Sequence, residues 1–158
     1  MKEKANKKPI LVPVDFSSHA EAALVHAAKI ADCLEVPVIV LHVVHDPGTM
    51  PGYYARASKK KFLVHIEDAA REMLDEFLAA ARHKEPELKA LKAAHSALVL
   101  GLPVSRILEV AKKEDAAMII MGSKGETGLK HLLVGSIAEQ VVHLAPIPVT
   151  IVKKGSSG

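Results

Sequence analysis

The sequence predicts an α/β protein in which helices cover both faces of an open, mainly parallel sheet. Apolar runs short enough for strands alternate with amphipathic stretches long enough for helices, and this alternation continues through the whole chain. The second run is continuously β-branched and apolar, as parallel strands covered on both faces require. The 158 residues are enough for one domain with a proper core.

The first strand and helix lie near the N-terminus. The apolar run Ile10–Phe16 predicts a buried strand, and Pro13 indicates where the chain leaves the sheet, because proline cannot donate a ladder hydrogen bond. Ser18 and Glu21 have capping-box spacing, so we expect a helix to begin there. The residues at helical spacing on its apolar face are Ala20, Ala23, Leu24, Ala27, Ile30, Ala31 and Leu34.

An irregular segment separates the second strand from the second helix. The run Val38–Val44 predicts the strand. Asp46–Lys61 contains prolines, glycines and a basic run, so we expect a loop. The helix is predicted over Phe62–Arg82. Its apolar stripe comprises Leu63, Ile66, Ala70, Met73, Leu74, Phe77 and Ala81.

The C-terminal half continues the alternation. Lys92–Leu100 predicts a weaker strand, and proline in the first turn suits a helix over Pro103–Lys113. The apolar run Ala116–Met121 predicts the fourth strand. The last helix is expected from Ser136 to about Ala145, followed by a short strand, Val149–Val152.

A glycine-rich stretch after the fourth strand carries the strongest functional signal. Gly122, Gly125 and Gly128 follow the strand, and Gly135 and Ser136 stand where the last helix begins. Glycines leave main-chain N–H groups bare, and the helix N-terminus adds the positive end of a dipole. We therefore predict a site for the phosphates of a nucleotide, with Ser136 as the helix cap.

Asp15, at the end of the first strand, is expected to lie beside this stretch. In an open parallel sheet, ligands bind beyond the carboxyl ends of the strands, where the strand order reverses. A carboxylate there can accept two hydrogen bonds from ribose hydroxyls. A role as N-cap is compatible, but Ser18 offers a better cap. Neither a Walker A motif nor a dinucleotide-binding glycine motif occurs in the sequence.

Composition narrows the classes of function. Aromatic residues make up 3% and tryptophan is missing, so we expect no nucleic-acid partner that stacks bases. No apolar run approaches the roughly 20 residues that span a bilayer, so no membrane association is expected. Cys33 is the only cysteine, which favours a reducing, cytoplasmic location. It falls within a helical apolar pattern, where we expect a packed thiol.

No metal site and no catalytic residue are predicted. His42 and His45, three residues apart on a strand, point to opposite sides. His19 and His26 share a helix face, but no acid or cysteine cluster joins them. The sequence also has no recognisable set of nucleophile, base and acid. We therefore expect the histidines to be hydrogen-bonded or solvated. The serines are expected to cap helices and to donate hydrogen bonds to phosphates.

The glycine pattern resembles the ATP-binding signature of the universal stress protein family, which is Gly122-x2-Gly125-x9-Gly135-Ser136 in this sequence. The first strand, Leu41-His42-Val43 and the Gly101-x-Pro103 turn look like the same family. The resemblance implies one Rossmann-like domain, residues 9–153, with strand order 3-2-1-4-5. A flexible basic segment (1–8) would precede it and a tail (154–158) would follow.

The resemblance also implies a role for each matching residue. In the family, Asp15 would take the ribose hydroxyls and Val43 would meet the adenine through its backbone. Lys124 stands where some members have His or Arg, and Ala138 where some have a hydroxyl residue. The full set of implied ATP-binding residues is Pro13, Val14, Asp15, Val43, Met121, Gly122, Ser123, Lys124, Gly125, Gly135, Ser136 and Ile137. The implied cofactor is ATP, with any Mg²⁺ carried by the nucleotide.

Assembly and function follow from the same resemblance. It implies a homodimer that pairs through Val149–Val152, and a nucleotide-responsive stress or regulatory module with an unidentified partner. Two alternatives stay open. One is a slow ATPase or autokinase that uses Ser136 or a neighbour, and the other is a dimerisation scaffold that binds no nucleotide.

Overall fold

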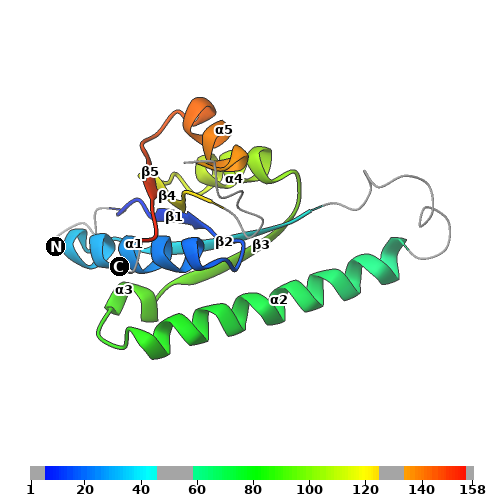
Figure 1. Ribbon diagram of the computed structural model, residues 1–158, viewed down its shortest axis with the longest axis horizontal. Coiled ribbons are helices and arrows are strands. Elements are labelled where there is room, and N and C mark those ends of the chain that lie inside the picture. Colours follow the sequence, from blue (N-terminus) through cyan, green and yellow to red (C-terminus); the bar gives the residue numbers. More distant parts are fainter. Residues whose placement is uncertain (1–5, 46–58, 125–133, 156–158) are drawn as a thin grey trace.

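A parallel sheet lies between two layers of helices (Figure 1). The structure is a computed structural model that describes residues 6–45, 59–124 and 134–155. The strands are β1 (Ile10–Pro13), β2 (Val38–His45), β3 (His95–Gly101), β4 (Met118–Gly122) and β5 (Val149–Val152). The helices are α1 (Ser18–Leu34), α2 (Lys59–Lys84), α3 (Lys89–Lys92), α4 (Pro103–Lys113) and α5 (Ser136–Leu144).

The sheet has five strands in the order β3-β2-β1-β4-β5, and all neighbours are parallel. The predicted fold class and strand order are therefore confirmed. β1 lies at the centre, where Ile10 pairs with Val38 of β2 on one side and Met118 of β4 on the other. The strand order reverses between β1 and β4, so the carboxyl ends of these two strands form the expected ligand edge.

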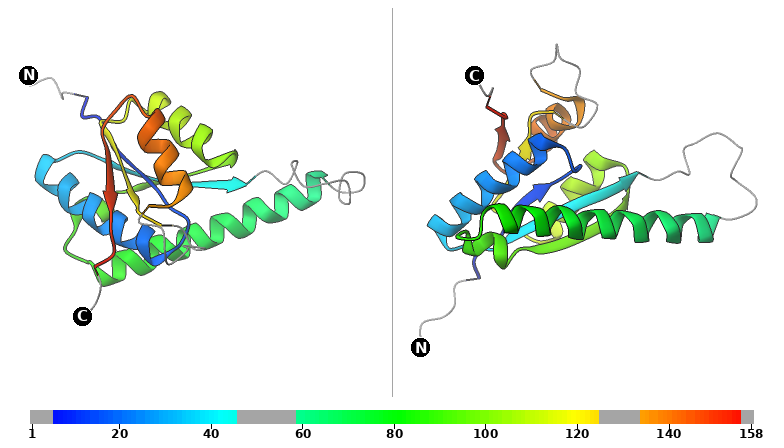
Figure 2. Two further views of the ribbon diagram at one scale, coloured as in Figure 1. Left: turned by 45° about the horizontal axis from the view of Figure 1, so that its top comes forward. Right: turned by 60° about the horizontal axis from the view of Figure 1, so that its bottom comes forward.

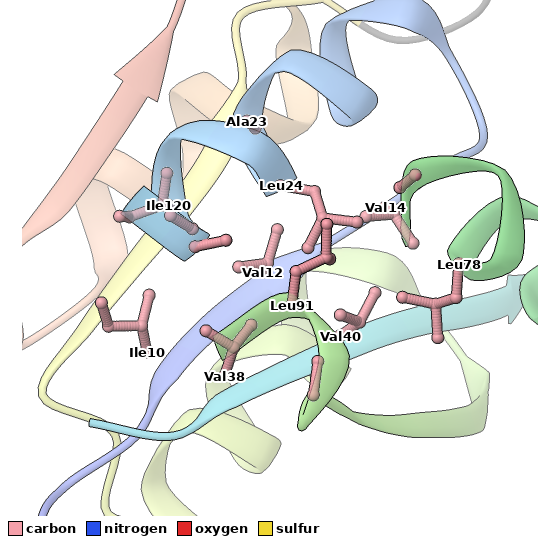
Figure 3. Packing of buried hydrophobic residues seen from close by; sticks show 14 of the residues in the cluster. Ile10, Val12, Val14, Ala23, Leu24, Val38, Val40, Leu78, Leu91 and Ile120 are labelled. Atoms are coloured by element: carbon pink, nitrogen blue, oxygen red, sulfur yellow. The ribbon is translucent and has the colours of Figure 1, made fainter. Parts of the chain in front are cut away.

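Helices α1, α2 and α3 cover one face of the sheet (Figures 1 and 2). Alternate residues of β1 and β2 point into this layer, because successive side chains of a strand face opposite ways. α1 supplies alanines such as Ala23, which bring its backbone close to the sheet. Figure 3 shows the packing of Ile10, Val12, Val38, Val40 and Ile120 against Leu24, Leu78 and Leu91.

Helices α4 and α5 cover the other face (Figure 1). The strand residues between those of the first core point this way, among them Leu11, Leu41 and Ile119, which are fully buried. Ile107 of α4 and Val141 of α5 complete the layer. The two cores share one sheet, so the ends of its strands are held from both sides.

Two expectations for α1 are wrong at its C-terminal end. Leu34 was placed on the apolar face but is 58% exposed, and Cys33 is exposed rather than packed. Residues 33–35 are all exposed, so the packed part of α1 ends with Ala31, which is in the core, and Asp32, which bonds to α3. Ala28, which the predicted face lacked, is fully buried instead.

α2 is longer and more narrowly packed than predicted. It begins at Lys59, inside the expected loop, and its N-terminal part extends past the end of the sheet (Figure 2). Its buried residues follow one line through Leu74, Leu78 and Ala81. Met73 was predicted to be core but is 50% exposed, because it lies one position off this line.

The third strand begins later than predicted because a short helix precedes it. Lys92 was placed in the strand, but it ends α3. Asp32 of α1 fixes this helix through both carboxylate oxygens, which accept hydrogen bonds from the N–H groups of Lys89 (3.0 Å) and Ala90 (2.7 Å). The cap comes from 57 and 58 residues away, so local sequence does not reveal it.

Candidate functional site

A cavity of about 280 Å³ opens at the carboxyl ends of β1, β2 and β4, bounded by α4 and α5. Every predicted site residue within the described ranges lines it, whereas Gly125, like Gly128 of the same loop, lies outside those ranges. These lining residues are Pro13, Val14, Asp15, Val43, Met121, Gly122, Ser123, Lys124, Gly135, Ser136 and Ile137. The structure thus brings together residues that the sequence separates by more than 100 positions.

The turn after β1 places Asp15 at the cavity. β1 ends at Pro13, three residues before the predicted end, and the N–H of Val14 donates to the carbonyl of Leu41 (2.8 Å) before the chain leaves the sheet. Phe16 then adopts the left-handed region, with φ at 66°, which is unfavourable for a bulky side chain. A carboxylate oxygen of Asp15 accepts a hydrogen bond from the N–H of Ser17 (3.0 Å) and so stabilises the turn.

Ser17, not Ser18, caps α1. Its hydroxyl accepts a hydrogen bond from the N–H of Ala20 (3.1 Å), and its backbone is extended, as an N-cap requires. The predicted cap, Ser18, is the first helical residue and is exposed. The prediction failed because two serines stand side by side at the helix start, and the helix begins at Ser18, one residue earlier than the capping-box pattern indicated.

The Phe16 side chain lies in a small aromatic cluster beside the cavity. Its ring lies 4.3 Å from the His42 ring and 5.7 Å from that of Phe77 on α2. The Nδ1 atom of His42 lies 2.8 Å from the carbonyl oxygen of Val14, and because that oxygen can only accept, Nδ1 carries the hydrogen. His42 also lines the cavity, which the sequence analysis did not predict.

Position 122 must be glycine because α1 packs directly against it. A Cβ at this position would lie 2.8 Å from the main-chain carbonyl carbon of His19 and 2.9 Å from its Cβ. The N-terminal turn of α1 therefore lies directly against the end of β4. This helix–strand contact is a reason for glycine at position 122 that the sequence analysis did not give.

Two main-chain hydrogen bonds fix the ends of the glycine stretch. The N–H of Ser123 donates to the carbonyl of Val152 on β5 (2.9 Å), and the N–H of Gly135 donates to the carbonyl of Ser123 (2.6 Å). Ser123 is almost fully buried. The chain consequently leaves β4 and enters α5 at one place, at the wall of the cavity.

The N-terminus of α5 has no side-chain cap. Gly135 is the N-cap, and Ser136, which was predicted to fill that role, is the first helical residue. The first N–H groups of a helix have no intrahelical acceptor. Since Gly135 offers no side-chain oxygen, the N–H groups of this turn and the helix dipole are available to an anion in the cavity.

Several apolar residues complete the cavity and were missed by the sequence analysis. Pro103 and Ile107 belong to α4, which follows β3 and crosses the sheet on its way to β4. The crossover rule for parallel strands could have identified them, because it places the helix between β3 and β4 against the sheet. The further unpredicted residues, besides His42, are Ala20, Leu41 and Ala138.

The cavity combines three kinds of surface. Asp15 supplies a carboxylate, α4 and β2 supply apolar side chains, and Lys124 with the start of α5 supplies positive charge. This arrangement suits a ligand with hydroxyls, a flat apolar part and an anionic group. Across the described ranges, no group of three or more His, Cys, Asp or Glu residues is placed to hold a metal ion, and no helix is long and apolar enough to cross a membrane.

Comparison with known proteins gives matches over nearly the whole chain. The model of the Universal stress protein family matches residues 7–153. Universal stress protein MJ0531 of Methanocaldococcus jannaschii is 32% identical, and the match covers 93% of this chain and 82% of that protein. Universal stress protein MJ0577 of the same organism is 30% identical over 95% of this chain and 97% of its own length.

Solved structures agree with these matches. The structure of MJ0577 superposes with a TM-score of 0.69 and covers 96% of this chain and 99% of its own. A universal stress protein from Archaeoglobus fulgidus in complex with dAMP has a TM-score of 0.64 at 28% identity, and covers 92% of this chain and 98% of its own. With the family match spanning residues 7–153, the chain belongs to the universal stress protein family.

Proposed function

We propose that this protein binds ATP in the cavity at the carboxyl ends of β1 and β4 and acts as a nucleotide-responsive stress or regulatory module. The observation that carries the proposal is the uncapped N-terminus of α5, which faces a cavity that Asp15 and Lys124 also line. In the proposed complex the phosphates lie at α5 and Lys124, and the ribose hydroxyls donate to Asp15.

The relatives support a nucleotide as the ligand. The Archaeoglobus fulgidus protein, which shares 28% identity with this chain, was solved in complex with dAMP. An adenine ring fits the apolar wall made by Val43, Pro103 and Ile107. Any Mg²⁺ would enter with the phosphates, because the described residues supply no metal-binding cluster.

We also propose a cytoplasmic homodimer that pairs through β5. β5 is the last strand of the sheet and pairs with β4 on one side only in the described part of the chain. Its four residues are all half-buried. An exposed strand edge is a template for pairing with a second chain. The cytoplasmic location rests on the cysteine usage of the sequence.

Replacement of Gly135 by residues that favour the N-cap position tests the phosphate site. Gly135 has φ −71° and ψ 158°, a conformation that Asp and Asn adopt readily as N-caps. Gly135→Asp should keep or raise the melting temperature and yet weaken ATP binding by about tenfold or more, because a carboxylate would occupy the anion site. Gly135→Asn, which has the same shape without the charge, should lose less affinity.

Isothermal titration with ATP, ADP and AMP measures these effects on each variant. Equal ATP affinity in the wild type and both variants would contradict the proposed phosphate site. Absence of any heat or thermal shift with all three nucleotides in the wild type would favour the nucleotide-free scaffold. Phosphate release that depends on Asp15 would favour the slow ATPase instead.

A further inference from the structure

A second hollow, of about 520 Å³, lies along the solvent side of α1, between the end of β5 and the C-terminal end of α2. Figures 1 and 2 show α1 between these two elements. The residues that line this hollow are distinct from those of the nucleotide cavity. We call it the basic groove, because Lys29 of α1, Lys84 of α2 and Lys154 after β5 line it.

The basic groove carries an excess of positive charge. Among its described lining residues the one acid is Glu21, and this carboxylate pairs with Lys84 (2.6 Å). Within the described ranges, Lys29 and Lys154 form no ion pair. Asp32, one turn from Lys29, directs both of its oxygens to the N–H groups of α3. In the described part of the chain, two cations from distant segments thus line one hollow without an ion-pair partner.

The groove also has apolar surface. Val25 of α1 and Val152 of β5 are half-buried and line the same hollow as the lysines. The lining residues of α1 run from Ser18 to Lys29, which corresponds to about 16 Å of helix. An extended peptide of about five residues spans the same length.

We infer that the basic groove docks an acidic segment of a partner protein, with carboxylates on Lys29 and Lys154 and an aliphatic side chain against Val25 and Val152. Lysines from three elements converge here and make the local electrostatic potential positive, which attracts an anionic partner. The described lining contains no Phe, Tyr or Trp side chain on which a nucleic-acid base could stack. A hollow between three elements also fits a peptide better than a flat lipid surface.

A double charge reversal tests this inference. The probe is a short, end-blocked, dye-labelled peptide in which glutamates flank a valine, and its binding is followed by fluorescence anisotropy at low salt. Lys29→Glu with Lys154→Glu should weaken binding by about tenfold or more, because two attractions become repulsions. The control, Lys112→Glu with Lys113→Glu, changes net charge equally at exposed positions at the end of α4, which do not line the groove.

The expected result is saturable binding to the wild type and the control, and loss of binding in the groove variant. Circular dichroism melts establish that each variant is folded. The inference is overturned if the wild type does not bind the peptide, or if both double variants lose affinity equally. It is also overturned if a lysine analogue of the peptide, single-stranded DNA or anionic vesicles bind the groove as tightly as the acidic peptide does.

Discussion

The backbone of His19 occupies the space that a side chain at Gly122 would need. An added Cβ would approach the carbonyl carbon of His19 to 2.8 Å and its oxygen to 2.9 Å. These are main-chain atoms at the start of α1, so they cannot rotate away as a flexible side chain can. The contact joins the turn after β1 to the end of β4, which are the two sides of the candidate nucleotide site.

Gly122→Ala is therefore expected to destabilise the protein by about 1–3 kcal/mol, the usual cost of overpacking a tight contact. Urea unfolding followed by circular dichroism measures the change in free energy. Gly155→Ala serves as the control, because nothing lies within 4 Å of a Cβ at that position. Equal stability of the two variants would show that α1 does not lie against β4 as described.

The position of the α1 cap can be tested with two adjacent serines. Ser17→Ala should cost about 1 kcal/mol, because the N–H of Ala20 loses its acceptor in a buried setting. Ser18→Ala should change stability little, since Ser18 is exposed and lies inside the helix. Thermal unfolding of the two variants distinguishes them, and a larger loss in Ser18→Ala would restore the cap that the sequence pattern suggested.

Asp32 is expected to hold α3 in place. Asp32→Ala removes the acceptor for two main-chain N–H groups and should destabilise the protein by about 1–2 kcal/mol. Hydrogen exchange should also become faster at Ala90, whose N–H donates to Asp32. Asp75→Ala, at an exposed position on α2, is the matched control. Unchanged exchange at Ala90 would contradict the cap.

The ion pair at the N-terminus of the described chain gives a pH dependence. The Lys7 ammonium donates to Glu35 (3.0 Å), and this hydrogen bond, together with its charge, lowers the pKa of the Glu35 carboxyl. Because the pKa of Glu35 is lower in the folded protein than in the unfolded chain, the ionised carboxylate stabilises the fold at pH values above the ordinary carboxyl pKa. This small contribution is lost as the pH falls through the lowered pKa. Both side chains are exposed, so salt should weaken the effect.

Carbon-detected NMR titration of Glu35 measures this directly. Lys7→Gln should raise the pKa of Glu35 toward the ordinary glutamate value, whereas Lys8→Gln, which breaks the pair with Asp115, should leave it unchanged. A Glu35 titration that is the same in all three proteins would show that the pair does not form in solution.

Patterns of apolar residues were sufficient to predict the alternating strands and helices and a parallel sheet covered on both faces. The order of the strands in the sheet was predicted from the family resemblance. The ends of elements were less predictable, because tertiary contacts decide them. Asp32 caps a helix far along the chain, and Leu34 becomes exposed where α1 packs no further.

The candidate site likewise has features that the sequence predicts and features that only tertiary contacts decide. Asp15 and Gly135 were expected to face one cavity, because parallel strands bring their carboxyl ends to one edge, and they do. His42 and Phe16 could not be predicted, because their contact depends on a left-handed residue and on the position of α2. Gly122 lines the cavity as expected, and its packing against His19 could not be predicted because it depends on where α1 lies.

The hydrogen bond from the N–H of Ser123 to the carbonyl of Val152 has a consequence for folding during synthesis. β5 is translated after the other described strands and helices, yet its carbonyl oxygen at Val152 is the acceptor for the N–H of Ser123, which begins the glycine stretch. A nascent chain that has emerged only as far as α5 contains every described residue that lines the cavity but lacks this anchor. Chains fold from the N-terminus during synthesis, so the proposed nucleotide affinity should be acquired only once β5 has emerged.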